Sequence, residues 1–273
     1  MLTPLEFSLV TLTPPDPNII VYELVLSTAL CCVGQTICWL LTPKDAKDRV
    51  HLADLYFSCL WAPTLSFTAF KATHELNQSG VEGRWNGGSY TAYIFLLVYI
   101  GGNFAHIPVT ILKKQTTLYK LQMFLHHAVS VACGIRGLFR GGGHFYASLS
   151  GCCELSTVFL NNLLLFKEWQ VDKRLQAVNG VLLWFSFLIL RLVLFGYWLY
   201  LYFTESAAYP DITGYNKLEA YEKVLYPGSV MILTGFSVKW FISITKGMIK
   251  TLTHGQDKAY KAASEELRTR KED

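Results

Sequence analysis

The sequence predicts an all-α polytopic membrane protein with seven transmembrane helices. Only 16% of its 273 residues are charged, whereas a soluble domain averages about 25%. Apolar runs of roughly 20 residues, long enough to cross a bilayer as helices, recur along the chain. Lysine and arginine gather in alternate loops between these runs, as they do in multi-pass membrane proteins.

We expect the seven helices over residues 18–41, 51–72, 89–112, 121–139, 145–166, 178–203 and 228–249. The first run is a retained helix and not a secretory signal, because no lysine or arginine precedes it. The chain then divides into a short N-terminus (1–18), a leading helix with its loop (19–49), a core of six helices (50–252) and a charged tail (253–273). We find no internal repeat and no soluble domain.

The distribution of basic residues predicts the orientation. One set of loops and the tail hold most of the lysine and arginine, and by the positive-inside rule this set is cytosolic. The N-terminus is then lumenal or extracellular and the C-terminus cytosolic. The glycosylation sequon Asn77-Gln78-Ser79 falls in a predicted outer loop, in agreement with this orientation.

The hairpin over residues 121–166 holds most of the candidate functional residues, and a Gly-rich turn (140–144) joins its two helices. Ionisable side chains inside a membrane are costly and usually mark a functional interior. The candidate catalytic groups are His126, His127 and Glu154. The candidate lipid- or substrate-binding residues are Ser130, Thr157 and Asn161 on the hairpin, with His106, Arg191 and Lys239 on other helices.

Counting residues from the helix ends places Glu154, Arg191 and Lys239 near the bilayer midplane. We therefore expect an ion pair between Glu154 and Arg191, with Lys239 as the rival partner. Such a pair also serves packing alone in many bundles, and His106 could simply bond to a neighbouring helix. Near the outer end of the fourth helix, two arginines are expected to reach the interface by snorkelling: Arg136 and Arg140.

Four ordered motifs resemble the TLC domain, the family of translocation-associated membrane proteins and longevity-assurance ceramide synthases. They are Leu125-His126-His127, the run from Glu154 to Asn161, Leu190-Arg191-Leu192, and Lys239-Trp240-Phe241 with Lys246. The resemblance covers about residues 50–252 and implies a seven-helix TLC-type bundle.

In the ceramide-synthase branch, a His-Asp-x-Ser-Asp element follows the histidine pair one helix later. Here the corresponding region is Cys152-Cys153-Glu154-Leu155-Ser156-Thr157, without a His-Asp pair. The chain is thus similar to TLC proteins outside that branch, which implies a role in membrane lipid homeostasis by binding or sensing a lipid between its helices. The alternative is an N-acyltransferase of ceramide metabolism that uses acyl-CoA and a long-chain amine, with His126 or His127 as base or nucleophile.

Other classes find less support. The receptor signature of an acidic-Arg pair after the third helix is missing, and no nucleic-acid-binding pattern appears. The seven cysteines lie inside apolar runs without metal or disulfide spacing, so we predict no metal and no cofactor. The Arg270-Lys271 pair resembles a retrieval signal and favours the endoplasmic reticulum. Whether any reaction is catalysed, which lipid is bound, the oligomeric state and the protein partners stay open.

Overall fold

A computed structural model describes residues 15–269, with side chains to residue 250 and at Thr253. Its elements are α1 (Pro17–Leu41), α2 (Arg49–Asn77), α3 (Gly80–Asn86), α4 (Tyr90–Leu112), α5 (Thr117–Arg140), α6 (His144–Gly151), α7 (Glu154–Glu168), α8 (Lys173–Phe187), the π-helix η1 (Leu188–Val193), α9 (Leu194–Ala208), α10 (Pro210–Thr213), the short η2 (Tyr215–Lys217) and α11 (Ala220–Thr269). The predicted all-α class is confirmed for these residues.

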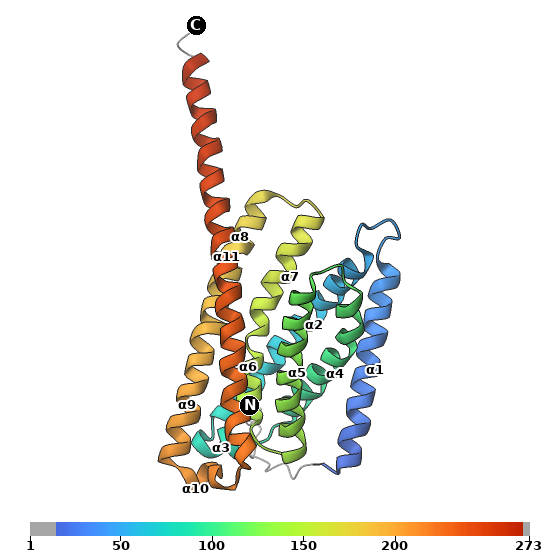
Figure 1. Cartoon of the computed structure of the whole chain (residues 1–273), viewed down its shortest axis with the longest axis vertical. Helices are drawn as coiled ribbons and strands as arrows, with labels where there is room; N and C mark the ends of the chain where they lie inside the picture. Colours follow the sequence, from blue (N-terminus) through green and yellow to red (C-terminus); the bar gives the residue numbers. More distant parts are fainter. Residues whose placement is uncertain (1–14, 270–273) are drawn as a thin grey trace, which may run out of the picture.

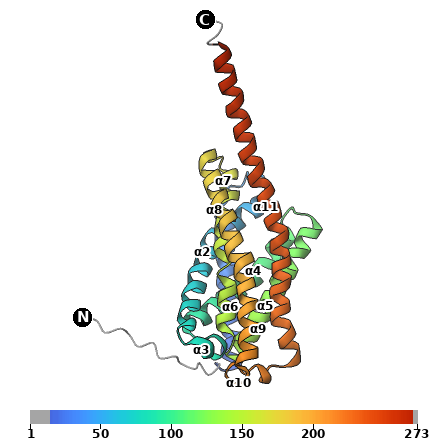
Figure 2. The same ribbon diagram turned by 90° about the vertical axis from the view of Figure 1, so that its left-hand side faces the viewer.

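The long helices lie side by side and run in alternating directions between two ends of a bundle (Figure 1). We call the end from which α11 projects the tail end; the α1–α2, α4–α5 and α7–α8 connections lie there. We call the opposite end the base; it holds the start of α1, the short helices α3 and α10, and the α5–α6 turn. A quarter-turn of the molecule shows the same arrangement, with α11 extending far beyond the bundle (Figure 2).

Within the part of the chain that the structure describes, five helical segments are long and apolar enough to cross a membrane: Pro17–Leu41, Gly80–Leu112, His144–Glu168, Lys173–Ala208 and Ala220–Lys250. The chain is therefore a multi-pass membrane protein. The α2 and α5 helices do not meet the same criterion, so the expected total of seven crossings stays a prediction for these two. The α2 helix contacts α1, α4, α6 and α7, and this protein environment explains why it needs fewer apolar residues than a lipid-facing helix.

Two of the expected helices are interrupted. At Cys152–Cys153 the backbone hydrogen bonds join residues three apart, as in a 3₁₀ turn; Cys153 N–H, for example, donates to the Ser150 carbonyl (3.2 Å). The helices α6 and α7 are therefore separate. The α8–α9 helix contains the π segment η1, with Arg191 inside it. Interruptions of this kind are common at functional sites. The prediction of unbroken helices over 145–166 and 178–203 is therefore wrong in this respect.

The ends of the elements also differ from expectation. The loop predicted before the third helix contains α3, and α11 begins at Ala220 and continues as far as Thr269. The predicted Gly-rich turn is confirmed: Gly141 ends α5 and Gly143 precedes α6, with φ of 71° and 74°, values that favour glycine. The expectations for residues 1–14 and for the Arg270-Lys271 pair fall outside the described residues.

Candidate functional site

A cavity of about 230 Å³ lies within the bundle and follows one face of α5. The α5 residues that line it are His126, Ser130, Cys133, Gly134, Gly137, Arg140 and Gly141. This spacing is that of a single helix face. At 1.5 Å of rise per residue, the stretch from His126 to Arg140 measures about 21 Å. The cavity is therefore long and narrow, and small side chains on α5 make room for it.

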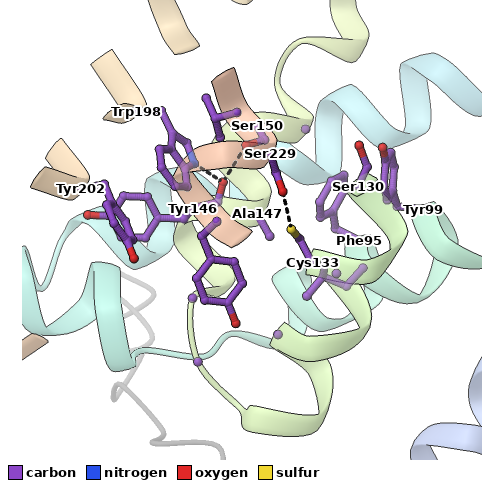
Figure 3. Close-up of a pocket in the computed structure, with 18 of the residues that line it drawn as sticks. Phe95, Tyr99, Ser130, Cys133, Tyr146, Ala147, Ser150, Trp198, Tyr202 and Ser229 are labelled. Carbon is purple, nitrogen blue, oxygen red and sulfur yellow. Dashed lines mark hydrogen bonds between the residues drawn. The ribbon is translucent and has the colours of Figure 1, made fainter. Parts of the chain in front are cut away.

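Aromatic side chains form the wall of the cavity towards the base (Figure 3). Tyr146 on α6 and Trp198 and Tyr202 on α9 pack closely; the Trp198 and Tyr202 rings are 5.1 Å apart and the Tyr146 and Trp198 rings 5.0 Å. The Trp198 indole donates to the Tyr146 carbonyl (2.9 Å). On the opposite side, Cys133 and Ser229 join α5 to α11 at 3.2 Å. These contacts hold α5, α6, α9 and α11 around the space.

The deep end of the cavity, in the middle of the bundle, holds polar groups with few partners. Nδ1 of His126 is buried and has no hydrogen-bond partner among the described residues. Glu154 is only 7% exposed, and within the described chain its carboxylate accepts only a weak 4.0 Å contact from the Cys153 thiol. Glu154 is the first residue of α7, where the helix dipole favours a negative charge. The side chains of Tyr99 and Ser130 lie beside one another in the same region (Figure 3).

The two adjacent histidines face different surroundings, because consecutive residues on a helix point about 100° apart. The His127 ring stacks on that of His106, with ring centres 5.4 Å apart and 12° between the planes. Nε2 of His106 donates to the Asp54 carboxylate (2.9 Å), which also binds Lys113 and accepts from Gln35 (3.2 Å). His127 thus belongs to a polar cluster between α2, α4 and α5, whereas His126 lines the cavity.

The expected ion pair between Glu154 and Arg191 does not form. Nε of Arg191 donates to the Ser156 hydroxyl (2.8 Å), and Nη2 donates to the Thr157 hydroxyl (3.0 Å). Arg191 lies in the π segment η1. Its guanidinium binds the first turn of α7, just after the interruption between α6 and α7. Arg191 lies level with the first turn of α7, and two hydroxyls satisfy the guanidinium in place of the carboxylate.

The other predicted residues lie apart from the cavity. Asn161 is buried on α7, and its side-chain nitrogen has no partner within the described chain. Lys239 is exposed on α11 and forms no ion pair within residues 15–250; its neighbour Trp240 instead contacts the His126 ring, with ring centres 5.7 Å apart. Within the described residues, no group of three His, Cys, Asp or Glu side chains could hold a metal ion.

Three acidic residues that the sequence reasoning did not select are buried and fully bonded. Asp54 could have been selected from the sequence, since it is the one acidic residue in the predicted second helix. Glu205 and Glu222 fell outside the predicted helices and were taken as loop residues. Glu222 accepts from Arg136 (2.7 Å) and from Arg140 (2.8 Å), a partner that the sequence did not predict. That these arginines reach the interface stays a prediction.

A sequence model of the TLC domain matches residues 50–246, most of the chain. The chain belongs to the TLC domain family. The match begins where the predicted core begins, ends six residues before its predicted end, and includes every residue that lines the cavity.

A human protein, TLC domain-containing protein 4, is 26% identical over 180 residues, which are 63% of this chain and 65% of that protein. The chain therefore spans slightly less than two thirds of this curated relative. No solved structure gives a significant match.

Proposed function

We propose that this TLC domain protein binds a lipid chain in the cavity beside α5 and thereby influences membrane lipid composition, as a lipid sensor or as a regulator of lipid-handling partners. The observation that carries the proposal is a narrow cavity of about 230 Å³ inside a membrane bundle, ending at a buried glutamate and a histidine without full partners. Buried polar atoms without partners are rare in folded proteins and call for an explanation. A bound molecule supplies one.

The proposal places the protein in the endoplasmic reticulum, with the base of the bundle lumenal and the tail end cytosolic. The support is the concentration of lysine and arginine in the connections at the tail end. In this orientation the cavity lies in the lumenal half of the bundle. A lipid from the lumenal leaflet would then be the natural ligand.

Acyl transfer to a long-chain amine finds less support in the geometry. The two histidine rings touch edge to face, with centres 5.4 Å apart, but His127 also stacks on His106 outside the cavity lining. Only His126 lines the cavity with Glu154.

The experiment compares two alanine-to-leucine variants. Ala147 lines the cavity and is labelled in Figure 3, whereas Ala132 is exposed on α5. Each purified protein is analysed by native mass spectrometry for bound lipid, and the membranes of expressing cells by lipid mass spectrometry. We expect Ala147→Leu to lose the bound lipid and Ala132→Leu to keep it.

Equal lipid occupancy in both variants, or no bound lipid in the unmodified protein, would contradict the proposal. The same preparations are incubated with acyl-CoA and a long-chain amine. Turnover that His126→Ala abolishes would replace lipid binding by acyl transfer as the function.

A further inference from the structure

The cavity has polar groups without full partners at both ends and mostly apolar walls between them, where the polar side chains bond to the protein. We infer that its ligand is a single hydrocarbon chain with an anionic group at one end and a hydroxyl group at the other. This inference rests on the proposed function and names the class of lipid. It follows from three features of the cavity: its deep end, its base end and its middle.

The deep end requires a hydrogen-bond donor. Glu154 presents a buried carboxylate whose one contact is the weak thiol contact described above, and His126 presents a buried Nδ1 without a partner in the described chain. A group that can both donate and accept, such as a hydroxyl, satisfies the two together. An alkyl chain end satisfies neither, and it would leave the carboxylate buried against hydrocarbon.

The base end requires a negative charge. Arg136 and Arg140 share the single carboxylate of Glu222, so this cluster has two positive charges for one negative charge. Arg140 lines the cavity and uses Nη1 for Glu222; its Nε and Nη2 form no hydrogen bond to any described residue. The Tyr202 hydroxyl, also in the cavity wall, is buried and lacks a partner in the described chain. A carboxylate or phosphate here would accept from both side chains.

The middle of the cavity admits one chain. Phe95, Leu96, Phe195, Val230 and Leu233 line it. Sites for drug-sized molecules measure about 300–1,000 Å³, whereas this cavity has about 230 Å³ spread over a length of about 21 Å. A volume this small over such a length suits one extended chain better than the two chains of a phospholipid.

The test uses the full-length protein and two probes that differ by one hydroxyl, hexadecanoic acid and ω-hydroxyhexadecanoic acid. We expect the hydroxylated chain to bind about tenfold or more tightly, the ratio that one hydrogen bond to a charged group supplies. Glu154→Leu should abolish this preference while hexadecanoic acid still binds. Because Leu removes a carboxylate that lacks strong partners, the variant should fold; His126→Phe is a second variant with the same expected result.

The base end has a matched pair of variants. Arg136→Gln and Arg140→Gln each remove one of the two arginines bonded to Glu222, but only Arg140 lines the cavity. We expect Arg140→Gln to weaken binding of both anionic probes about tenfold and Arg136→Gln to leave it nearly unchanged.

Equal affinity for the two probes, or a preference that survives Glu154→Leu and His126→Phe, would overturn the inference while the proposed function stands. Equal effects of Arg136→Gln and Arg140→Gln on probe affinity would likewise rule out an anionic group of the ligand at the base end. If neither probe binds but a two-chain lipid is found in the protein, the inference fails and the proposed function stands. If no lipid of any kind binds, both fail.

Discussion

A substitution at Glu205 should destabilise the bundle strongly, because this buried residue bonds to three side chains at the base. Its carboxylate, 5% exposed, joins α3, α6 and α9 at the base. One oxygen binds the Arg84 guanidinium. The other accepts from the Trp85 indole (2.8 Å) and from the Tyr146 hydroxyl (3.0 Å). Every partner is a donor, and Tyr146 is also part of the cavity wall.

The change Glu205→Gln keeps the shape and removes the charge. Wherever the amide nitrogen lies, it points a donor at a group that can only donate, either the Arg84 guanidinium or the Trp85 indole. Removing one partner of a buried ion pair costs about 3–5 kcal/mol. Since Arg84 keeps some access to solvent, with 16% of its side chain exposed, we expect about 3 kcal/mol, the lower end of that range.

Thermal unfolding of the purified protein in detergent measures this loss, with an expected fall in Tm of roughly 6–12 °C. Glu75→Gln is the control, because Glu75 pairs at 3.8 Å with Lys71, which is 54% exposed, and such pairs contribute about 0–1 kcal/mol. Equal small shifts for the two variants would refute the reasoning that Glu205 holds the base together.

Three further predictions concern packing, the π segment and topology. Gly151→Ala should destabilise the protein by about 1–3 kcal/mol, because the added Cβ would lie 2.2 Å from a Phe95 ring atom. Gly180→Ala is the control, since its added Cβ meets nothing within 4 Å. Equal melting temperatures for the two variants would contradict this prediction. Arg191→Lys should lower stability by about 1–3 kcal/mol, because one ammonium cannot reproduce the two hydrogen bonds that Nε and Nη2 donate to Ser156 and Thr157. An unchanged unfolding transition would argue against the importance of these bonds. A tag placed after Asp273 should be cleaved by protease added to sealed microsomes, and protection of the tag would reverse the proposed orientation.

Helix positions could largely be predicted because they depend on apolar length and on charge between the runs. The polar Gly-rich turn and the all-α class followed from these simple features. The interruptions at Cys152–Cys153 and at Leu188–Val193 could not be predicted in this way. Neither contains proline, and both depend on how α7 and η1 meet through Arg191.

The partners of the candidate residues were harder to predict than their positions. The depth of a residue along its helix does not say in which direction its side chain points around the helix axis. Glu154 and Arg191 were therefore expected to pair, although each faces a different neighbour. The rotation of adjacent residues was available from the sequence, and it separates His126 from His127. The cavity itself could not be predicted, because small residues such as Gly134 and Gly137 equally predict close helix packing.

The proposed function requires a lipid chain in the cavity beside α5. An experimental density map of the full-length protein in a lipid bilayer disc tests this directly. We predict continuous density for one chain along the face of α5, from the level of His126 to that of Arg140. A cavity with only isolated water-sized density, or one filled by side chains, would contradict the account.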